Sequence, residues 1–466
     1  MSSEFGLKRV LGLGDLVAIE IGTTVGAGIF SLTALAVAFT GPSAPLAFLA
    51  AAIPIVFIMM TVGMLGSTMP TVGGTYRYPS RLFSPMWATV GVWCYALGLV
   101  FGALPLYATE CAHYLQAVWP GIPVKAAAIG LLTVFFLVNV FGISIAASFQ
   151  ALMVVALIIA LLVFGIGGLP SVDPNNFIPP FPEGAGGFIL AACILTFALQ
   201  GSNSVIELGA EIKRPRRNIP VSLLISIPVV TVIYILVAVS AVGNMDLDVW
   251  KGLGDNANLT QPARNFLSSP LFVFFLVGGA LFAFTTTING TFMWSTKSLM
   301  VVAKDRIMPP ALARTGRFGT PVRFLALLWI LSVVAVLAGA GIKIFASYAT
   351  IGGMIIFIPS MIAAMLLPRR VPELYNSAGF RLRGAMLYIA PCIGIITSAL
   401  LIVILLADLE LWSLPFLGWL VLGVAFYSIR KRSVEKQTGE KFSQMLDRDL
   451  EAMIGECRDA AQEREE

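Results

Sequence analysis

Long apolar segments alternate with short polar connections along most of the chain. A helix that crosses a lipid bilayer needs roughly 20 predominantly apolar residues, and twelve segments come close to this length. They lie at 12–39, 45–68, 86–117, 124–142, 145–168, 187–208, 221–243, 270–300, 322–340, 346–367, 385–407 and 412–429. The pattern predicts an all-α polytopic membrane protein with twelve transmembrane helices. The boundary between the fourth and fifth segments is the least distinct, because only the turn Gly142-Ile143-Ser144 separates them.

Composition agrees with this prediction, since 58% of the residues are hydrophobic and only 12% are charged. With the N-terminus inside, the outer connections hold only four basic residues, Lys125, Lys251, Arg264 and Lys343. Nearly all other basic residues fall on inner segments, namely Lys8, Arg9, Arg77, Arg81, Lys213, Arg214, Arg216, Arg217, Lys304, Arg306, Arg314, Arg317, Arg323, Arg369, Arg370, Arg381, Arg383 and those of the C-terminal tail. This asymmetry places both termini in the cytoplasm and the protein in the cell membrane. The basic charge is thus a signal of topology, and no nucleic-acid partner is expected.

Two of the predicted spans contain residues that interrupt a helix. Span one carries Gly22-Thr23-Thr24-Val25-Gly26-Ala27-Gly28, and each glycine costs about 1 kcal/mol relative to alanine within a helix. Span six is interrupted at Phe197-Ala198-Leu199-Gln200-Gly201-Ser202-Asn203-Ser204. Unwound backbone at membrane depth occurs only where it lines a cavity or is buried in protein. The residues could simply allow close helix packing, but a pair of breaks five spans apart, in helices of opposite direction, favours a transporter's binding site between two inverted repeats.

Such breaks suit a zwitterion. The half-helix that begins near Gly26 offers backbone N–H groups and the positive end of a helix dipole to a carboxylate. The carbonyls freed in both breaks can accept hydrogen bonds from an ammonium group. An amino acid supplies both charges, so the expected partner is a small amino acid or a related amine.

Several motifs in the same order resemble the amino acid–polyamine–organocation (APC) superfamily, whose members have the leucine-transporter (LeuT) fold. They are Gly26-Ala27-Gly28-Ile29-Phe30, Pro70-Thr71-Val72-Gly73-Gly74-Thr75-Tyr76, Asn139-Val140-Phe141-Gly142, Glu211-Ile212-Lys213-Arg214-Pro215-Arg216-Arg217-Asn218-Ile219-Pro220, and Ala303-Lys304-Asp305 with Pro309. The resemblance implies two inverted five-helix repeats, with spans one and six discontinuous, and alternating access around a site at the membrane midplane. The units expected are 1–168, 187–367, two further helices in 385–430, and an amphipathic cytoplasmic tail in 431–466.

The resemblance also implies roles for particular residues. Thr24, Gly26, Ala27 and Gly28 match the backbone that holds the substrate's head group. In span six, Phe197 matches an aromatic gate, while Gln200 and Gly201 match the turn that binds the amine. Thr291 matches a position that lines the side-chain pocket. Asn203 stands where some relatives of cationic specificity have an acidic residue, which favours a neutral substrate; a cationic amino acid or a polyamine is the alternative.

The coupling ion is left open between sodium and a proton, and simple exchange is a third possibility. Some proton-driven relatives have a lysine in span five, where this chain has Leu157. Thr285 and Thr286 match a hydroxyl pair that binds sodium together with carbonyls equivalent to those of Gly22 and Val25. Oxygen ligands suit such a hard cation, although hydroxyls on a membrane helix also bond to their own helix.

A second coupling scheme uses carboxylates. Glu20 lies just before the break in span one, and Glu110 lies in the outer half of span three. An ionisable group within the membrane is a functional candidate by default, and each of these acids could carry a proton or hydrogen-bond between helices as a neutral acid. Lys297, near the inner end of span eight, is expected to reach the interface or to pair with an acid.

Other classes of protein fit less well. The chain has a single histidine, His113, and lacks the HExxH, GxSxG and Walker A motifs, so neither an enzyme nor a bound cofactor is expected. A channel, or a sensor that binds an amino acid without moving it, is the remaining alternative. The tail has apolar residues at helical spacing, from Phe442 to Cys457, which predicts a helix docked on the protein's own inner face or one with a regulatory role. The sequence does not determine the oligomeric state.

Overall fold

The structure is a computed structural model that describes residues 9–30, 32–116, 119–253 and 257–462. Lys8, residue 117 at the end of the third predicted span, and the last four residues of the tail lie outside this described part. The described chain is helical, and its few extended contacts are two isolated β-bridges, Leu11–Ile212 and Val72–Leu208. The predicted all-α class is therefore confirmed.

The helices follow the predicted spans. The first five spans correspond to α1 (Leu13–Thr24) with α2 (Ala27–Phe30) and α3 (Leu32–Thr40), then α4 (Ala44–Thr68), α6 (Pro85–Gly98) with the π-helical turn η3 (Leu99–Ala103) and α7 (Leu104–Gln116), α8 (Val124–Val140) and α9 (Ile143–Gly168). The next five correspond to α10 (Gly184–Ala198) with the 3₁₀ turn η6 (Ser202–Glu207), α11 (Pro215–Gly243), α14 (Ser269–Phe274) with the π-helical turn η9 (Phe275–Leu281) and α15 (Phe282–Lys304), α16 (Val322–Ala338) and α17 (Ile342–Arg370). The last two are α19 (Met386–Asp408) and α20 (Ser413–Thr438).

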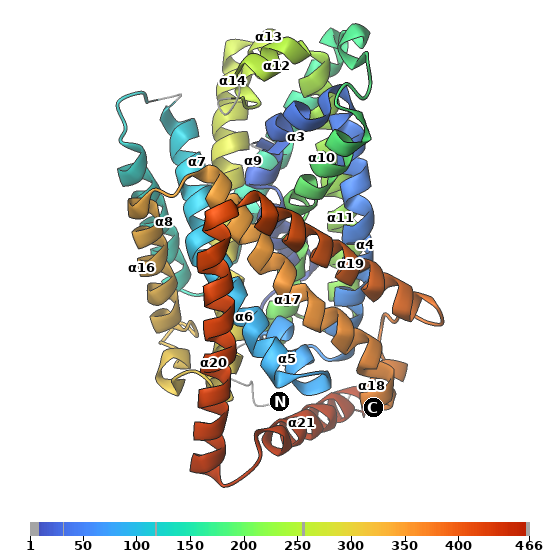
Figure 1. Cartoon of the computed structure of the whole chain (residues 1–466), viewed down its shortest axis with the longest axis vertical. Coiled ribbons are helices and arrows are strands. Elements are labelled where there is room, and N and C mark those ends of the chain that lie inside the picture. The colour runs from blue at the N-terminus through green and yellow to red at the C-terminus, as the bar shows by residue number, and fades with distance from the viewer. Residues whose placement is uncertain (1–8, 31, 117–118, 254–256, 463–466) are drawn as a thin grey trace.

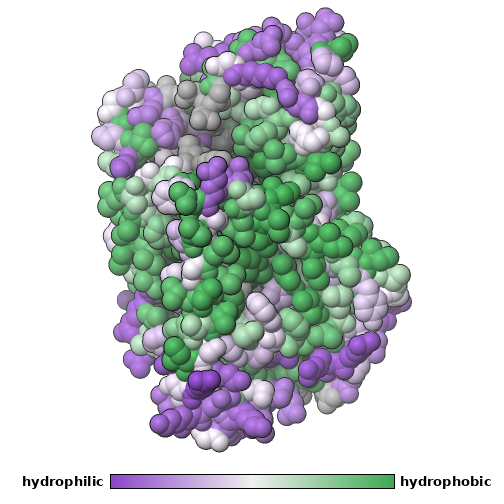
Figure 2. Space-filling model, in the orientation of Figure 1, coloured by the Kyte–Doolittle hydropathy of each residue, from purple (hydrophilic) through white to green (hydrophobic). Residues whose placement is uncertain are grey.

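Ten helical stretches of the described chain are long and apolar enough to cross a membrane. The apolar helices α8 and α16 fall in a shorter class of 10–17 residues, so the count of twelve crossings stays a prediction. Figure 2 shows a broad hydrophobic belt around the molecule with hydrophilic residues gathered at its two ends. This distribution is that of an integral membrane protein.

The two ends of the molecule differ. One of them carries both ends of the described chain together with α5 (Gly74–Leu82), α18 (Pro372–Asn376) and α21 (Phe442–Gln462), and we call it the terminal face (Figure 1). The opposite end, the loop face, carries α12 (Leu247–Leu253) and α13 (Thr260–Phe266). These two short helices belong to the long connection 244–269 between the seventh and eighth spans.

Helix α1 lies at the centre of the fold, against α9, α11, α15 and η6. Its neighbours approach closely because small residues face one another. A Cβ at Gly290 of α15 would collide with the side chain of Thr23, and a Cβ at Gly28 would lie 2.6 Å from that of Ala198 in α10. The broken span is therefore enclosed by protein on several sides, as unwound backbone inside a membrane requires.

Two features differ from the predicted elements. Helix α5 lies between the second and third spans and is buried, although it contains two arginines. Helix α20 continues to Thr438, beyond the predicted end of the last span at 429, because charged residues near a membrane surface can extend a helix into water. The tail then forms α21, whose Phe442, Leu446 and Leu450 are buried. The expectation of a helix docked on the protein's own surface is confirmed.

Candidate substrate-binding site

Both predicted breaks are present and they face each other. Helix α1 ends at Thr24 and α2 begins at Ala27, while α10 ends at Ala198 and η6 begins at Ser202. Between the latter two, Gly201 has a φ of +135°, which residues with a side chain rarely adopt. A Cβ at this position would also lie 2.7 Å from the backbone of Thr23 and Thr24. The glycine thus allows the two unwound segments to make direct backbone contact.

Side-chain hydroxyls hold the two breaks together. The hydroxyl of Tyr234, a fully buried residue of α11, is 2.9 Å from the carbonyl oxygen of Thr24 and 3.2 Å from that of Ala198. One phenol group therefore reaches the ends of both interrupted helices. The Thr23 hydroxyl donates to the Gly201 carbonyl at 3.2 Å, and the hydroxyls of Thr24 and Ser202 lie 3.3 Å apart.

The residues expected to bind the head group lie at these breaks. Gly26 packs so closely on Thr287 of α15 that a Cβ would collide with the threonine hydroxyl. Val25 is buried, and its N–H donates to the Ile21 carbonyl at 2.7 Å, which closes the last turn of α1. Ala27 contributes the backbone that starts α2; its side chain lies outside the description. Phe197 is half-buried in the last turn of α10.

Three other predicted residues take different directions. Gln200 points toward α17, where its Nε2 lies 3.8 Å from the Met354 sulfur and its Oε1 would meet a Cβ at Gly353. The side-chain oxygen of Asn203 accepts from the Gly201 N–H at 3.3 Å and so stabilises the turn locally. Thr291 is buried in α15.

The predicted hydroxyl pair of the sodium-type site does not meet span one. Thr285 donates to the Leu281 carbonyl and Thr286 to the Ala283 carbonyl, each at 2.9 Å, so both bond within α15 or the turn before it. The hydroxyl that reaches span one belongs to Thr287, which lies 3.1 Å from the Gly22 carbonyl oxygen. Successive residues are rotated by about 100° around the axis of a helix, so an error of one position in matching a residue to a motif places its side chain on a different face of the helix.

A chain of buried amides, which the sequence analysis missed, ends beside Gly22. Asn139 of α8 donates to Asn289 of α15 at 2.9 Å, and Asn289 donates to the Gln150 oxygen at 3.0 Å. The Gln150 Nε2 would collide with a Cβ at Gly22, and it has no hydrogen-bond partner among the described residues. Leu157 is buried two turns further along α9. In the sequence, Asn139 stands out only as part of the motif Asn139-Val140-Phe141-Gly142. Gln150 could have been identified as a candidate because it is an amide residue within an apolar span.

The two carboxylates proposed for coupling are both buried. Glu20 of α1 accepts hydrogen bonds from Ser222 at 2.6 Å and Ser226 at 2.5 Å, two serines one turn apart on α11. This pairing satisfies both carboxyl oxygens without a cation. Glu110 lies in α7, away from these serines in the sequence.

Further polar contacts close the terminal side of the breaks. Glu207, at the end of η6, accepts from the Ser298 hydroxyl at 2.7 Å and from both the backbone and the hydroxyl of Thr75. Lys297 pairs with Glu211 at 2.8 Å, and both side chains are about 3% exposed. The expectation that Lys297 pairs with an acid is confirmed. Glu207 was missed, because the sequence pattern of span six points to its glycine and amide residues.

Aromatic residues cover the breaks on both sides. Trp294 stacks on Tyr95 at 5.5 Å between ring centres, and it lies on α15 between Thr291 and Ser298. Toward the loop face, Phe30 packs edge-on against Tyr114 at 5.9 Å. The candidate site is thus an enclosed pair of unwound segments near the middle of the helical bundle.

A polytopic helical protein with two facing broken helices has the architecture of a solute transporter. The chain belongs to the amino acid permease family, whose model matches residues 11–426. It is similar to the branched-chain amino acid permease BcaP of Bacillus subtilis (strain 168), with 24% identity over 93% of this chain and 96% of the relative. The methylthioribose transporter of that organism is 26% identical over 92% and 95% of the two chains, and the glutamate/serine transporter AimA is 25% identical over 85% and 77%. The family and these relatives are permeases and transporters, so the protein is not an enzyme.

Proposed function

We propose that the protein is a secondary active transporter that carries a small neutral amino acid by alternating access. The observation that carries this proposal is the direct contact of the two unwound segments at Gly201 and Thr23. Two of the relatives, BcaP and AimA, are named for amino acids, which supports the class of substrate. The methylthioribose transporter shows that similar chains also carry other solutes.

The breaks offer complementary groups for the head of an amino acid. The substrate's ammonium group would donate hydrogen bonds to carbonyls of the two segments, such as those of Thr24 and Ala198. In the structure, the Tyr234 hydroxyl contacts both of these carbonyls. The substrate carboxylate would face the N–H groups at Gly26–Gly28, where the second half of span one begins. Opening on alternate faces would then expose the same groups to either side.

The state of nearby carboxylates favours a neutral side chain on the substrate. Glu20 is held by two serines, Glu207 by Thr75 and Ser298, and Glu211 by Lys297. A cationic side chain would need a carboxylate released from one of these contacts, at the cost of a buried polar group left without its partner. A cationic amino acid or a polyamine is therefore the alternative that the substrate panel below tests.

For coupling, we propose that a proton carried by Glu20 is the driving ion. The amide nitrogen of Gln150 lies against Gly22, where a sodium ion would need oxygen ligands instead. Glu20→Gln keeps the shape of the side chain and one of its two accepting oxygens but cannot carry a proton, so it should reduce uptake or flatten its pH profile. If both the rate and the pH profile stay at wild-type values, Glu20 is structural and sodium or exchange becomes the better account.

We propose that the terminal face lies on the cytoplasmic side of the cell membrane, because the basic residues of the predicted connections gather there. Reporter fusions that are active only inside or only outside the cell, placed after residue 466, test this orientation. A signal from the outer reporter would reverse it.

The direct test of function is uptake of radiolabelled amino acids into proteoliposomes. Neutral, acidic and cationic amino acids and a polyamine are compared under imposed sodium and proton gradients and with substrate inside. Saturable uptake of a neutral amino acid that a proton gradient drives supports the proposal. Binding without flux would indicate a sensor, and the absence of binding by every compound would refute the assignment of substrate class.

A further inference from the structure

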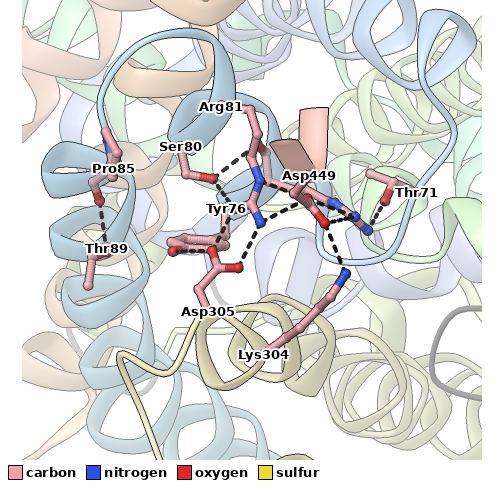
Figure 3. A network of polar contacts seen from close by, with 10 residues as sticks. Thr71, Tyr76, Ser80, Arg81, Pro85, Thr89, Lys304, Asp305 and Asp449 are labelled. Carbon is pink, nitrogen blue, oxygen red and sulfur yellow. Dashed lines mark hydrogen bonds and ion pairs between the residues drawn. The ribbon is translucent and has the colours of Figure 1, made fainter. Parts of the chain in front are cut away.

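A buried basic cluster lies beneath the site at the terminal face (Figure 3). It centres on Arg77 and Arg81 of α5, which are 2% and 5% exposed. Arg81 binds both oxygens of Asp305, just after α15, at 2.6 and 2.7 Å, and the Tyr76 hydroxyl donates to the same carboxylate at 2.8 Å. These bonds join α5 to the end of α15. The neighbouring Arg77 donates to the Thr71 hydroxyl at 2.8 Å.

Helix α5 is wedged between η6 and α15. Gly73 has a φ of +64°, and a Cβ there would lie 2.8 Å from the Lys297 carbonyl of α15. A Cβ at Gly74 would lie 2.6 Å from the Ile206 carbonyl of η6. Thr75 contacts Glu207 on one side and Ser298 on the other. Opening the site toward the terminal face therefore requires α5 to separate from η6, from α15 or from both.

One residue of the tail completes the cluster. Asp449 of α21 lies 3.0 Å from Arg77. It also lies 3.0 Å from Arg81 and 3.0 Å from Lys304, which is the last residue of α15 (Figure 3). Burial alone would raise the pKa of Asp449, but the three cations outweigh burial and hold the pKa well below its usual range. The tail thus ties α5 to α15 by charge and supplies the carboxylate that Arg77 binds.

The remainder of α21 fits the same surface. Its buried face includes Phe442, Leu446 and Leu450, and Phe442 packs edge-on against Tyr427 of α20 at 6.2 Å. The helix lies against α5, α18 and α20. Residues 442–462 include five acidic and two basic side chains. An acidic helix of this kind is repelled by an anionic membrane surface but complements the basic cluster.

We propose that α21 is a latch that holds α5 against α15 and keeps the terminal face closed. Docking of the tail then sets the fraction of molecules that open on this face, and with it the rate of the transport cycle. The proposal rests on the alternating access proposed above, but it concerns opening and can be measured without transport. Release of the tail would remove the Asp449 carboxylate that Arg77, Arg81 and Lys304 share. The Arg81–Asp305 pair would then hold α5 to the end of α15 without this second carboxylate, so that α5 separates from α15 more readily.

The test measures opening by the reactivity of a buried cysteine in purified protein. Ser204→Cys is a small change in η6, at a fully buried residue whose hydroxyl has no hydrogen-bond partner among the described residues. Its rate of modification by a thiol reagent is compared in the otherwise wild-type chain, in Asp449→Asn, in Asp447→Asn and in a chain that ends at Gly439. Asp447 is exposed on the same helix and provides the matched control. The native Cys111 in α7, 2% exposed, reports opening or unfolding elsewhere.

We expect modification of Ser204→Cys to become at least about tenfold faster in Asp449→Asn and in the shortened chain, because each loses at least one of the charge-assisted hydrogen bonds that Asp449 accepts from Arg77, Arg81 and Lys304. Asp447→Asn should match the parent, and Cys111 should stay unreactive in every chain. Equal rates in all four chains would overturn the proposal. So would an equal rise in both aspartate variants, which would indicate a general effect of charge, or a parallel rise at Cys111, which would indicate unfolding.

Discussion

Removal of the hydroxyl of Tyr234 tests whether the two breaks act as one site. In Tyr234→Phe the ring remains, packed edge-on against Phe48 at 5.3 Å, but the carbonyls of Thr24 and Ala198 lose their shared donor. The Thr24 carbonyl still accepts from the Gly26 N–H at 3.0 Å, so the cost falls on the Ala198 carbonyl, and a buried acceptor left without a partner costs about 1–3 kcal/mol. About 1.4 kcal/mol is a factor of ten in an equilibrium constant. The equilibrium constant for the arrangement in which the two breaks are aligned should therefore fall by roughly tenfold.

We expect this loss to appear as weaker substrate binding. The dissociation constant, measured by scintillation proximity on purified protein, should rise by about tenfold, and the KM for uptake should rise with it. Tyr388→Phe is the matched control, because Tyr388 of α19 is 47% exposed and lies on the outer surface of the bundle. It should bind substrate as the wild type does.

Two results would refute this reasoning. If Tyr234→Phe lowers the thermal stability but leaves the dissociation constant and KM unchanged, the hydroxyl only stabilises the fold. If binding becomes tighter, the freed carbonyls serve the substrate better than the aligned arrangement does. In either case the breaks do not depend on Tyr234 to present a binding surface.

Three further predictions concern positions already described. Gly201→Ala should abolish uptake, because the φ of this residue is +135° and a Cβ would meet the backbone of span one. Gly186→Ala, at a position with open space around it, should leave uptake in the same assay unchanged. Thr287→Val should lower the uptake rate by removing the bond to span one, while Thr286→Val, whose hydroxyl bonds within its own helix, should not; the reverse order would restore the original sodium-site hypothesis. The pKa of Asp449 is depressed, so the contribution of its charge to docking of α21 is complete above the ordinary aspartate pKa and is lost only as pH falls toward the depressed pKa. The rate of hydrogen exchange in α21, corrected for intrinsic rates, should therefore be equal at about pH 5 and pH 8. Faster corrected exchange at pH 5 would contradict this.

The helices and their breaks could be predicted from sequence because both depend on local chemistry. A run of apolar residues of sufficient length gives a span, and the glycines and threonines from Gly22 to Gly28 weaken a helix wherever they occur. The docked tail followed from apolar spacing alone, beginning at Phe442. The two inverted repeats remain a prediction.

Contacts between helices were harder to predict, because they depend on how each helix is rotated and tilted. Thr285 and Thr286 are equally plausible ligands in a sequence, yet the bundle directs Thr287 to Gly22. Tyr234 looks like any aromatic residue in an apolar span until α11 is placed beside both breaks. Likewise, the charge of Asp449 acquires a partner only when a segment more than 350 residues away, α5, is folded beneath the same face.

The stacked pair of Trp294 and Tyr95 has a practical consequence. Trp294 is 6% exposed, and its indole N–H has no hydrogen-bond partner among the described residues. Opening of the terminal side would admit water to this indole, and the emission of an excited tryptophan moves to longer wavelength when polar molecules can reorient around it. Among the eight tryptophans of the protein, Trp294 is therefore placed so that its emission would change with opening of the terminal side, and comparison with a Trp294→Phe variant would isolate this signal without an added dye.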